Sequence, residues 1–291
     1  MLLAQSFGGE LVNYDSIQIF RHLNIGSAKA TAEERARVPH HLIDIREPTE
    51  MYTAGDYQRE AREALKEISD RGKIPILVGG TGLYLKALTE GLFAGPQRSE
   101  SLRVRLEAIA EKKSREHLHR MLQRLDPEAA ARIMPRDKPK IIRALEVKLE
   151  TGKALTEHLQ GRPRDPLVGF NMHFIGLSPD RDELYARIDE RVVRMFEAGL
   201  VKEVRELLAN GVPRTAKPLE AIGYRQVLSY LDSCNRKEDT IRSIQRDTRR
   251  YAKRQVTWFR RQANVKWLNG PGDRDETKEK ARQYVEQLLT F

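Results

Sequence analysis

The sequence predicts an α/β protein whose mostly parallel sheet is interrupted by a helical insertion. Short apolar segments alternate with segments of helical period over the first 92 residues, as in strand–helix–strand units with parallel strands. Strand character is then absent from about residue 93 to 166 and returns at 173–177. The chain has 291 residues, of which 40% are hydrophobic, so it can build one large domain or two ordinary ones.

Five elements are expected before the insertion. The first strand lies between two glycines and Asp15, the second ends at Pro48, and the first long helix stops at Gly72. A strand of the buried type then leads into a glycine-rich loop and a further helix. In chain order, the elements are expected at 10–14 (strand), 41–45 (strand), 57–69 (helix), 74–78 (strand) and 83–88 (helix).

The insertion is expected to be helical and to span residues 93–170, between edges rich in proline and glycine. Apolar residues follow a helical period from Leu102 to Leu125, and a later helix ends at Gly152. Residues 1–92 and 171–291 are therefore expected to form one discontinuous α/β core. The elements expected after the insertion are a strand at 173–177, a long helix at 179–210, a basic helix from 241 and a strand at 265–268.

The composition excludes several classes of protein. A chain with 40% hydrophobic and 32% charged residues is neither a membrane protein nor a disordered one, and no apolar run approaches the ~20 residues that span a bilayer. The single cysteine, Cys234, excludes a disulfide framework and a multi-cysteine zinc site, and it fits a reducing compartment. The first residues lack the features of a signal peptide. We therefore expect a cytoplasmic protein.

The net charge of +10 is concentrated in one segment. Residues 241–266 hold nine basic residues and one acid, a net charge of +8, so the other 265 residues together carry +2. An apolar stripe of helical spacing, including Ile244 and Trp258, leaves the charges free to face outward. Arg outnumbers Lys by 35 to 17, and Arg binds phosphate through two hydrogen bonds and stacks on bases. The pattern favours a nucleic-acid partner, and a solvated helix face is the alternative.

Two motifs follow predicted strands, where ligands gather in open α/β sheets. The first is Asp15-Ser-Ile-Gln18, and the second is Gly79-Gly-Thr-Gly-Leu-Tyr84. Consecutive glycines allow backbone amides to turn toward an anion, and Thr81 adds a hydroxyl at the start of a helix. An ordinary strand-to-helix turn with a threonine cap is the alternative for the second motif, and a turn or N-cap role is the alternative for Asp15. The sequence contains no G-x-x-x-x-G-K-[ST] phosphate-binding loop.

These motifs belong to a longer ordered set, which resembles that of the tRNA dimethylallyltransferases. The resemblance runs from about residue 4 to 268 and implies a fold of the P-loop nucleotide-hydrolase type with a helical insertion that binds tRNA. Its segments, in chain order, are Gly9-Glu-Leu-Val, Asp15-Ser-Ile-Gln, Ile25-Gly-Ser-Ala-Lys29, Val38-Pro-His-His-Leu-Ile-Asp44, Ile74-Pro-Ile-Leu-Val-Gly-Gly-Thr-Gly-Leu-Tyr84, Arg143-Ala-Leu-Glu146, Ala221-Ile-Gly-Tyr-Arg-Gln226 and Lys253-Arg-Gln-Val-Thr-Trp258.

The resemblance implies transfer of a dimethylallyl group from dimethylallyl diphosphate to the exocyclic amine of the adenosine 3′ of the anticodon. This amine is a weak nucleophile, so a carboxylate that takes its proton suits the reaction, and Asp15 matches the catalytic aspartate of the family. Thr81 matches a second catalytic residue, at the base or the phosphate. Gly79, Gly80 and Thr81 are the candidates for diphosphate binding. The diphosphate leaving group implies Mg²⁺ as the cofactor, with metal ligands that the sequence leaves unknown.

The resemblance also implies the residues that bind the anticodon arm of tRNA. The target base has to leave its stack to reach the site. The expected tRNA-binding residues are Asp15, Ser16, Ile17, Gln18, Arg103, Lys140, Arg143, Tyr224, Arg225, Lys253, Arg254, Gln255 and Arg260. For each basic residue of the set, a surface salt bridge is the alternative. The expected partners are tRNA and dimethylallyl diphosphate, with no membrane, and the chain is expected to be a monomer.

The sequence departs from the family at its start. Family members begin with a strand, a phosphate-binding loop and a helix, and Met1-Leu-Leu-Ala-Gln-Ser-Phe7 resembles only the end of that helix. About 20 residues are therefore expected to be missing, through a misplaced start or a truncated gene. An inactive tRNA-binding remnant is the alternative function. A small-molecule phosphotransferase is a third hypothesis, which the missing loop and the clustered arginines disfavour.

Overall fold

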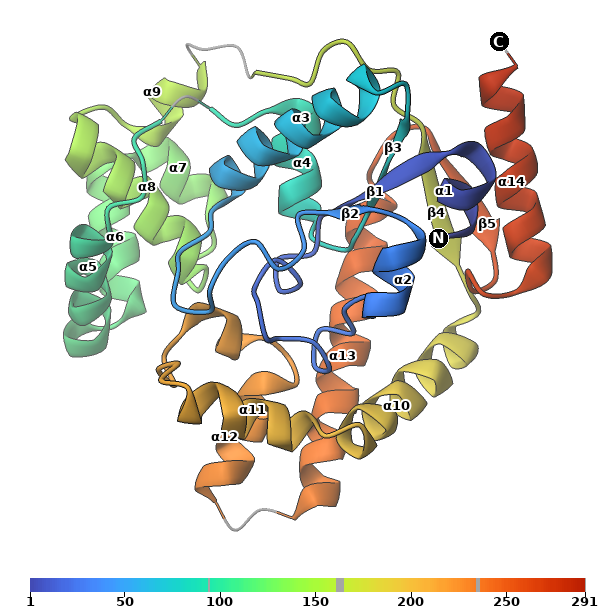
Figure 1. Ribbon diagram of the computed structural model, residues 1–291. Helices are drawn as coiled ribbons and strands as arrows, with labels where there is room; N and C mark the ends of the chain where they lie inside the picture. The colour runs from blue at the N-terminus through green and yellow to red at the C-terminus, as the bar shows by residue number, and fades with distance from the viewer. Residues whose placement is uncertain (94, 161–164, 234–235, 291) are drawn as a thin grey trace. The chain divides into compact units, whose positions relative to one another are not determined.

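A computed structural model describes residues 1–93, 95–160, 165–233 and 236–290 (Figure 1). The described chain divides into two compact units, Met1–Thr89 with Leu167–Phe291 and Glu90–Pro166. The chain therefore leaves the first unit near residue 90 and returns to it near 167, close to the limits of the expected insertion. Cys234 lies outside the described residues.

The first unit contains a three-stranded parallel sheet in the order β2–β1–β3 (Figure 1). Its strands are β1 (Gly9–Asn13), β2 (His40–His41) and β3 (Ile74–Val78). The register pairs Leu11 with His40 and Val12 with Leu77. Parallel strands need a crossover connection, and helices supply it here. The crossover helices are α2 (Ala32–Arg37), between β1 and β2, and α3 (Ala54–Asp70), between β2 and β3. Helix α1 (Leu2–Phe7) precedes β1, and α4 (Gly82–Glu90) follows β3.

Helix α3 illustrates how the sequence builds this sheet. Thr53 and Asp56 form a reciprocal capping box at its start, which satisfies two backbone donors that a helix leaves free. Its apolar face is buried from Tyr57 to Ile68 and packs in the same core as Val12 of β1. The expected helix at 57–69 thus begins three residues earlier, because the capping box lies upstream of the first apolar position.

A second parallel sheet of the first unit pairs β4 (Phe174–Ser178) with β5 (Val265–Asn269). Every residue of β4 has its partner in β5, from Phe174 with Val265 to Ser178 with Asn269. All the described elements between these strands are helices. They are α10 (Arg181–Glu197), α11 (Leu200–Ala209), a 3₁₀ turn (Lys217–Glu220), α12 (Tyr224–Asp232) and α13 (Lys237–Phe259), and α14 (Asp275–Leu289) follows β5.

Two expected elements are wrong in extent. In place of the strand expected at 41–45, the structure has the two-residue strand His40–His41, because Leu42 and Asp44 adopt left-handed backbone angles, φ 60° and 56°, that end the ladder. The single helix expected at 179–210 is two helices, because Gly199 has φ 100° and interrupts the helix between α10 and α11. Apolar periodicity continues across Gly199, so the pattern by itself does not reveal the break.

The helices α10 to α13 pack with the segment after β1 in one core. Ile19, Phe20 and Leu23 of that segment are buried against Val192 and Ile244, among others. The loop that follows β1 is therefore a packed part of the fold, and its conformation depends on the helices beneath it. None of the described helices is long and apolar enough to cross a membrane.

All the regular elements among the described residues of the second unit are helices. Asp126 is buried there, and its carboxylate accepts hydrogen bonds from the backbone nitrogen of Ala129 and from the nitrogen and hydroxyl of Thr156. Its core gathers around Leu118, Leu122 and Leu145. The helices are α5 (Glu100–Lys113), α6 (Arg115–Leu125), α7 (Pro127–Arg132), α8 (Lys138–Thr151) and α9 (Leu155–Gln160).

Candidate functional site

Two loops meet at the carboxyl ends of β1 and β3. The backbone nitrogen of Tyr14 donates to the carbonyl of Val78 at 2.9 Å, and the nitrogen of Thr81 donates to the carbonyl of Tyr14 at 3.3 Å. The hydroxyl oxygen of Thr81 accepts a hydrogen bond from the nitrogen of Ser16 at 3.0 Å and lies 3.3 Å from the Ser16 hydroxyl. The structure thus brings together the two motifs that the sequence singled out.

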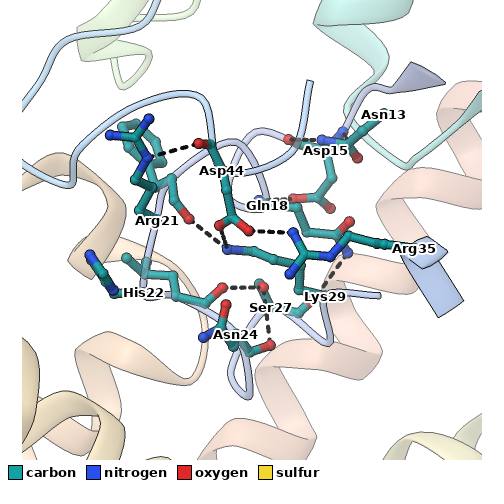
Figure 2. Close-up of polar contacts among 12 residues, drawn as sticks. Asn13, Asp15, Gln18, Arg21, His22, Asn24, Ser27, Lys29, Arg35 and Asp44 are labelled. Atoms are coloured by element: carbon teal, nitrogen blue, oxygen red, sulfur yellow. Dashed lines mark hydrogen bonds and ion pairs between the residues drawn. The ribbon is translucent and has the colours of Figure 1, made fainter. Parts of the chain in front are cut away.

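The Asp15 carboxylate has one engaged oxygen and one open oxygen. Its Oδ1 accepts hydrogen bonds from the backbone nitrogens of Ile17 at 2.8 Å and Gln18 at 3.2 Å. Asp15 thus has the turn role that was the alternative to a catalytic one. The Asn13 side chain accepts from the nitrogen of Asp15 (Figure 2). It also donates to the carbonyl of Leu42. Within the described chain, Oδ2 of Asp15 has no hydrogen-bond partner. The turn therefore fixes the carboxylate while leaving one oxygen able to accept a proton.

The charge of Asp15 acts on three side chains from other elements, Tyr84, Tyr251 and Arg191. Burial raises the pKa of Tyr84 and of Tyr251, and the Asp15 charge raises both further. Arg191 of α10 is exposed overall, but desolvation of its guanidinium lowers its pKa and the Asp15 charge opposes that shift. Arg191 is not among the predicted site residues, because it is one of several arginines in a helix and no local signal relates it to Asp15.

The glycines of the second motif allow close packing. A Cβ atom on Gly80 would lie 2.0 Å from Nε2 of Gln255, and one on Gly82 would lie 2.5 Å from the indole ring of Trp258. The Gln255 amide donates to the carbonyl of Gly80 at 3.0 Å. Helix α13 therefore rests directly on the loop that follows β3, and a side chain at Gly82 would force the Trp258 ring away from it.

Helix α13 carries the basic segment. Lys253, Arg254 and Arg260 are exposed, whereas Trp258 is half-buried and packs edge to face with Phe259 at a centroid distance of 4.8 Å. This agrees with the expected helix, in which the apolar stripe faces the protein and the charges face outward. The same helix thus contacts the glycine loop on one side and presents positive charge on the other.

Comparison with known proteins identifies the family. The model of the IPP transferase family matches residues 18–262. The chain belongs to the IPP transferase family. It is 54% identical over 271 residues to the tRNA dimethylallyltransferase of Koribacter versatilis, and the alignment covers 93% of this chain and 88% of that relative. It is 48% identical over 289 residues to the protein of the same name from Solibacter usitatus, with 99% of this chain and 94% of the relative covered.

Solved structures of IPP transferases have the same fold. The full-length tRNA isopentenylpyrophosphate transferase of Bacillus halodurans superposes with a TM-score of 0.71 at 39% identity, over 99% of this chain and 91% of the other. A eukaryotic dimethylallyltransferase, described as acting on tRNA, gives a TM-score of 0.78 at 27% identity, with 98% of this chain and 75% of the other chain covered. The predicted α/β fold class and the predicted family are confirmed.

Within this IPP transferase, Ile17, Gln18 and Arg225 are at least partly accessible. Gln18 turns its amide toward the protein, where Nε2 donates to the carbonyls of Ser27 at 3.1 Å and Ala28 at 3.4 Å (Figure 2). Ile17 is half-buried against the main core. Arg225 is exposed and forms a 2.7 Å ion pair with Asp247 of α13. Burial opposes ionisation of Asp247, but Arg225 and Arg246 outweigh it and lower the pKa of this carboxyl.

Tyr224 requires a correction to the prediction that it contacts tRNA. Its side chain is 0% exposed, and its hydroxyl donates to Oε1 of Glu203 at 2.8 Å. Burial, followed by the charge and the hydrogen bond of Glu203, raises the pKa of this hydroxyl, so it is a neutral donor. A buried ring already paired inside the protein cannot contact RNA in this conformation. The adjacent Arg225 is the exposed residue of that motif.

The second unit holds the remaining predicted tRNA-binding residues. Arg103 and Arg143 both pair with Glu146, whose side chain is 0% exposed: Arg103 donates twice at 2.9 Å and Arg143 once at 2.6 Å. Arg143 also donates to the carbonyl of Pro96. Lys140 is exposed and pairs with Asp137 at 2.6 Å. The cluster of two arginines and one glutamate keeps a net positive charge, although it also has a structural function.

The family implies a divalent metal ion, and the donors present fit it only in part. No group of three or more His, Cys, Asp or Glu side chains that could hold a metal occurs among the described residues. Mg²⁺ keeps several waters and takes ligands from substrate phosphates, so it needs few protein ligands. The open oxygen of Asp15 and the hydroxyls of Ser16 and Thr81 are oxygen donors of the kind it prefers.

Proposed function

We infer that this chain transfers a dimethylallyl group from dimethylallyl diphosphate to an adenosine of tRNA. The single observation that carries this inference is its 54% identity, over 93% of the chain, to a protein named tRNA dimethylallyltransferase. The site supports the inference, since a carboxylate with one open oxygen lies at the strand ends, where an α/β protein binds its ligands. We propose that the acceptor is the exocyclic amine of the adenosine 3′ of the anticodon.

Asp15 is the proposed general base. The amine nitrogen attacks the allylic carbon, a C–N bond forms, and the C–O bond to the diphosphate breaks with its electron pair leaving on oxygen. The lost N–H proton passes to Oδ2 of Asp15, because Oδ1 is already occupied by two backbone donors. A residue in this role typically contributes ~10²–10⁴-fold to the rate.

The glycine loop and Thr81 are proposed to receive the diphosphate. Their position beside Asp15, through the Ser16 hydrogen bond, would place donor and base at one site. Mg²⁺, bound mainly by diphosphate oxygens, would neutralise the charge that develops on the leaving group. In this proposal the Thr81 hydroxyl orients the Ser16 turn, and the loop backbone orients the diphosphate.

Recognition of tRNA is proposed to use the exposed charges of α13 and the turn after β1. Lys253, Arg254 and Arg260 would neutralise backbone phosphates, and Ser16 with Gln18 would contact the anticodon loop. The target base has to be extruded from its stack, as base-modifying enzymes require. In the second unit, Lys140, Arg103 and Arg143 would add phosphate contacts. A cytoplasmic location and a monomeric state are part of the same proposal. The mass of the protein in solution tests the monomeric state.

The decisive experiment incubates this chain with radiolabelled dimethylallyl diphosphate, Mg²⁺ and unmodified tRNA. Label in the adenosine 3′ of the anticodon, lost with EDTA and with a transcript carrying guanosine at that position, is the expected result. Binding of tRNA without labelled product would contradict the proposal and favour a protein that only binds tRNA. Neither binding nor product would exclude both functions.

A further inference from the structure

Glu203 of α11 lies beneath the loop that follows β1, and its carboxylate accepts four hydrogen bonds. Oε2 accepts from the backbone nitrogens of Asn24 at 2.9 Å and Ile25 at 2.7 Å. Oε1 accepts from the nitrogen of Gly26 at 3.1 Å and from the hydroxyl of Tyr224 at 2.8 Å. Glu203 is 8% exposed, so these bonds form away from solvent and replace most of its hydration.

Gly26 and Tyr224 complete this arrangement by shape. A Cβ atom on Gly26 would lie 2.6 Å from the Tyr224 ring, so the ring packs flush against the loop backbone. The ring therefore covers the carboxylate and closes the loop onto α11 and α12. Three consecutive amides pointing at one carboxylate allow the loop a single arrangement at this place.

A continuous set of hydrogen bonds joins this carboxylate to Asp15. The nitrogen of Ala28 donates to the carbonyl of Ile25 at 3.1 Å, inside the segment that Glu203 holds. The Gln18 side chain then donates to the carbonyls of Ser27 and Ala28 (Figure 2). Finally, the nitrogen of Gln18 donates to Oδ1 of Asp15. The amide donors at Glu203 and the carboxylate of Asp15 are thus opposite ends of one packed loop.

A second anchor holds the same loop through a different carboxylate, that of Asp44. Lys29, with a side chain 1% exposed, donates to Asp44 at 2.6 Å and to the carbonyl of Phe20 at 2.7 Å (Figure 2). Burial raises the pKa of Asp44, but Lys29 and Arg35 together outweigh it and keep this carboxyl ionised. Glu203 acts on Lys29 only through its charge and takes part in neither of these hydrogen bonds, so the loop stays attached to the protein when the Glu203 bonds are weakened.

We propose that Glu203 is a positioning residue for the transfer reaction, which sets the conformation of residues 15–29 and thereby the placement of Asp15 and Gln18. The proposal rests on the transferase function inferred above. Glu203 touches neither reacting group, so it acts only through the loop. Its neighbour Tyr224 shares this function as the fourth donor, which accounts for its place in a motif expected to contact tRNA.

The variant Glu203→Gln tests the proposal with almost no change in volume. An amide group offers only one acceptor oxygen, so at least one pair of donors loses its partner and faces an N–H group instead. Misplacement of a reacting group by ~1 Å can cost ~10²-fold. We expect kcat to fall at least ~10-fold and KM for tRNA to rise, with KM for dimethylallyl diphosphate within ~2-fold of wild type.

Two further variants provide the comparison. Tyr224→Phe keeps the ring on Gly26 and removes one of the four bonds, so its kinetic effect should lie between wild type and Glu203→Gln. Glu206→Gln changes an exposed glutamate of the same helix that pairs with Lys202, and its kinetics should match wild type. The proposal would be overturned if Glu203→Gln lowered only the free energy of unfolding and left both KM values and kcat per active site unchanged.

Amide hydrogen exchange gives a readout that does not depend on transferase activity. Glu203→Gln should accelerate exchange at Asn24, Ile25 and Gly26 and also at the distant amides of Ile17 and Gln18. Acceleration confined to residues 24–26 would overturn the proposed coupling to Asp15. If the wild-type chain transfers nothing, this result still decides the positioning role, so the failure of either hypothesis can be distinguished.

Discussion

The side-chain oxygen of Thr81 accepts a hydrogen bond from the backbone nitrogen of Ser16 at 3.0 Å, across 65 positions of sequence. This contact joins the turn after β1, which carries Asp15, to the glycine loop after β3. Parallel pairing of β1 and β3 makes it possible, because the carboxyl ends of both strands lie at the same edge of the sheet. The proposed base and the proposed diphosphate loop therefore share one site.

Asp15→Asn should abolish transfer while preserving the turn. The asparagine oxygen can still accept from the nitrogens of Ile17 and Gln18, but the side chain can no longer take a proton. We expect kcat to fall ~10²–10⁴-fold and the Kd for tRNA to stay within ~2-fold. Asp180→Asn is the matched control, since Asp180 also accepts from two backbone nitrogens, at the start of α10, and should leave kcat unchanged. Loss of tRNA binding in Asp15→Asn would assign Asp15 a structural role.

Gly82→Ala should destabilise the protein more than Gly80→Ala. The new methyl group at Gly82 would lie 2.5 Å from the rigid indole of Trp258, whereas at Gly80 it would meet the end of the flexible Gln255 side chain. Overpacking of this kind costs ~1–3 kcal/mol. Urea unfolding should give a lower free energy of unfolding for Gly82→Ala. The opposite order would show that the Gln255 hydrogen bond, and not the indole contact, holds α13 on the loop.

Affinity for tRNA should fall steeply with salt. If about six basic residues contact phosphates, log affinity should change with log salt at a slope of roughly −4 to −5. Lys253→Ala and Arg260→Ala should each make the slope shallower by about 0.7–0.9. Arg242→Ala is the control, because Arg242 pairs with Asp239 in the first turn of the same helix. A flat salt response would contradict the proposed RNA-binding face of α13.

Glu146→Gln should reveal a stability term that depends on pH. Burial raises the pKa of Glu146, but Arg103, Arg143 and the Ser99 amide together hold it below its ordinary value. Its contribution to the free energy of unfolding is thus fully present above the unfolded pKa of about 4.3, and it is lost as the pH falls through the lower folded pKa.

The variant should therefore be less stable than wild type by roughly 2–3 kcal/mol at pH 7, and the difference should shrink below about pH 4. Urea unfolding followed by circular dichroism over this range measures both quantities. Glu100→Gln changes an exposed glutamate of the same unit and should show a far smaller difference. A difference independent of pH would mean that packing, and not the charge of Glu146, stabilises the cluster.

Local pattern was sufficient for much of the fold. The expected strand at 74–78 is β3 to the residue, since a short β-rich run between turn residues leaves little choice. The break at Gly199 was not predictable in this way, because apolar period says where a helix is buried and not where glycine adopts a positive φ. The extent of the second strand was not predictable for a related reason. Asp44 leaves the ladder to bind Lys29 and Arg35, which lie outside the strand, so the strand pattern does not encode this contact.

The candidate site likewise contains residues that the sequence predicted and residues that only the tertiary structure revealed. By itself the sequence determined the family motifs, the basic helix and the choice of Asp15 and Thr81, because these depend on residue type and spacing along one segment. Only the tertiary structure decided that Tyr224 is buried against Glu203 and that the charge of Asp15 acts on Arg191. Burial and electrostatic neighbours arise from contacts between α10, α11, α12 and the loop after β1, and no periodicity within one segment encodes such contacts.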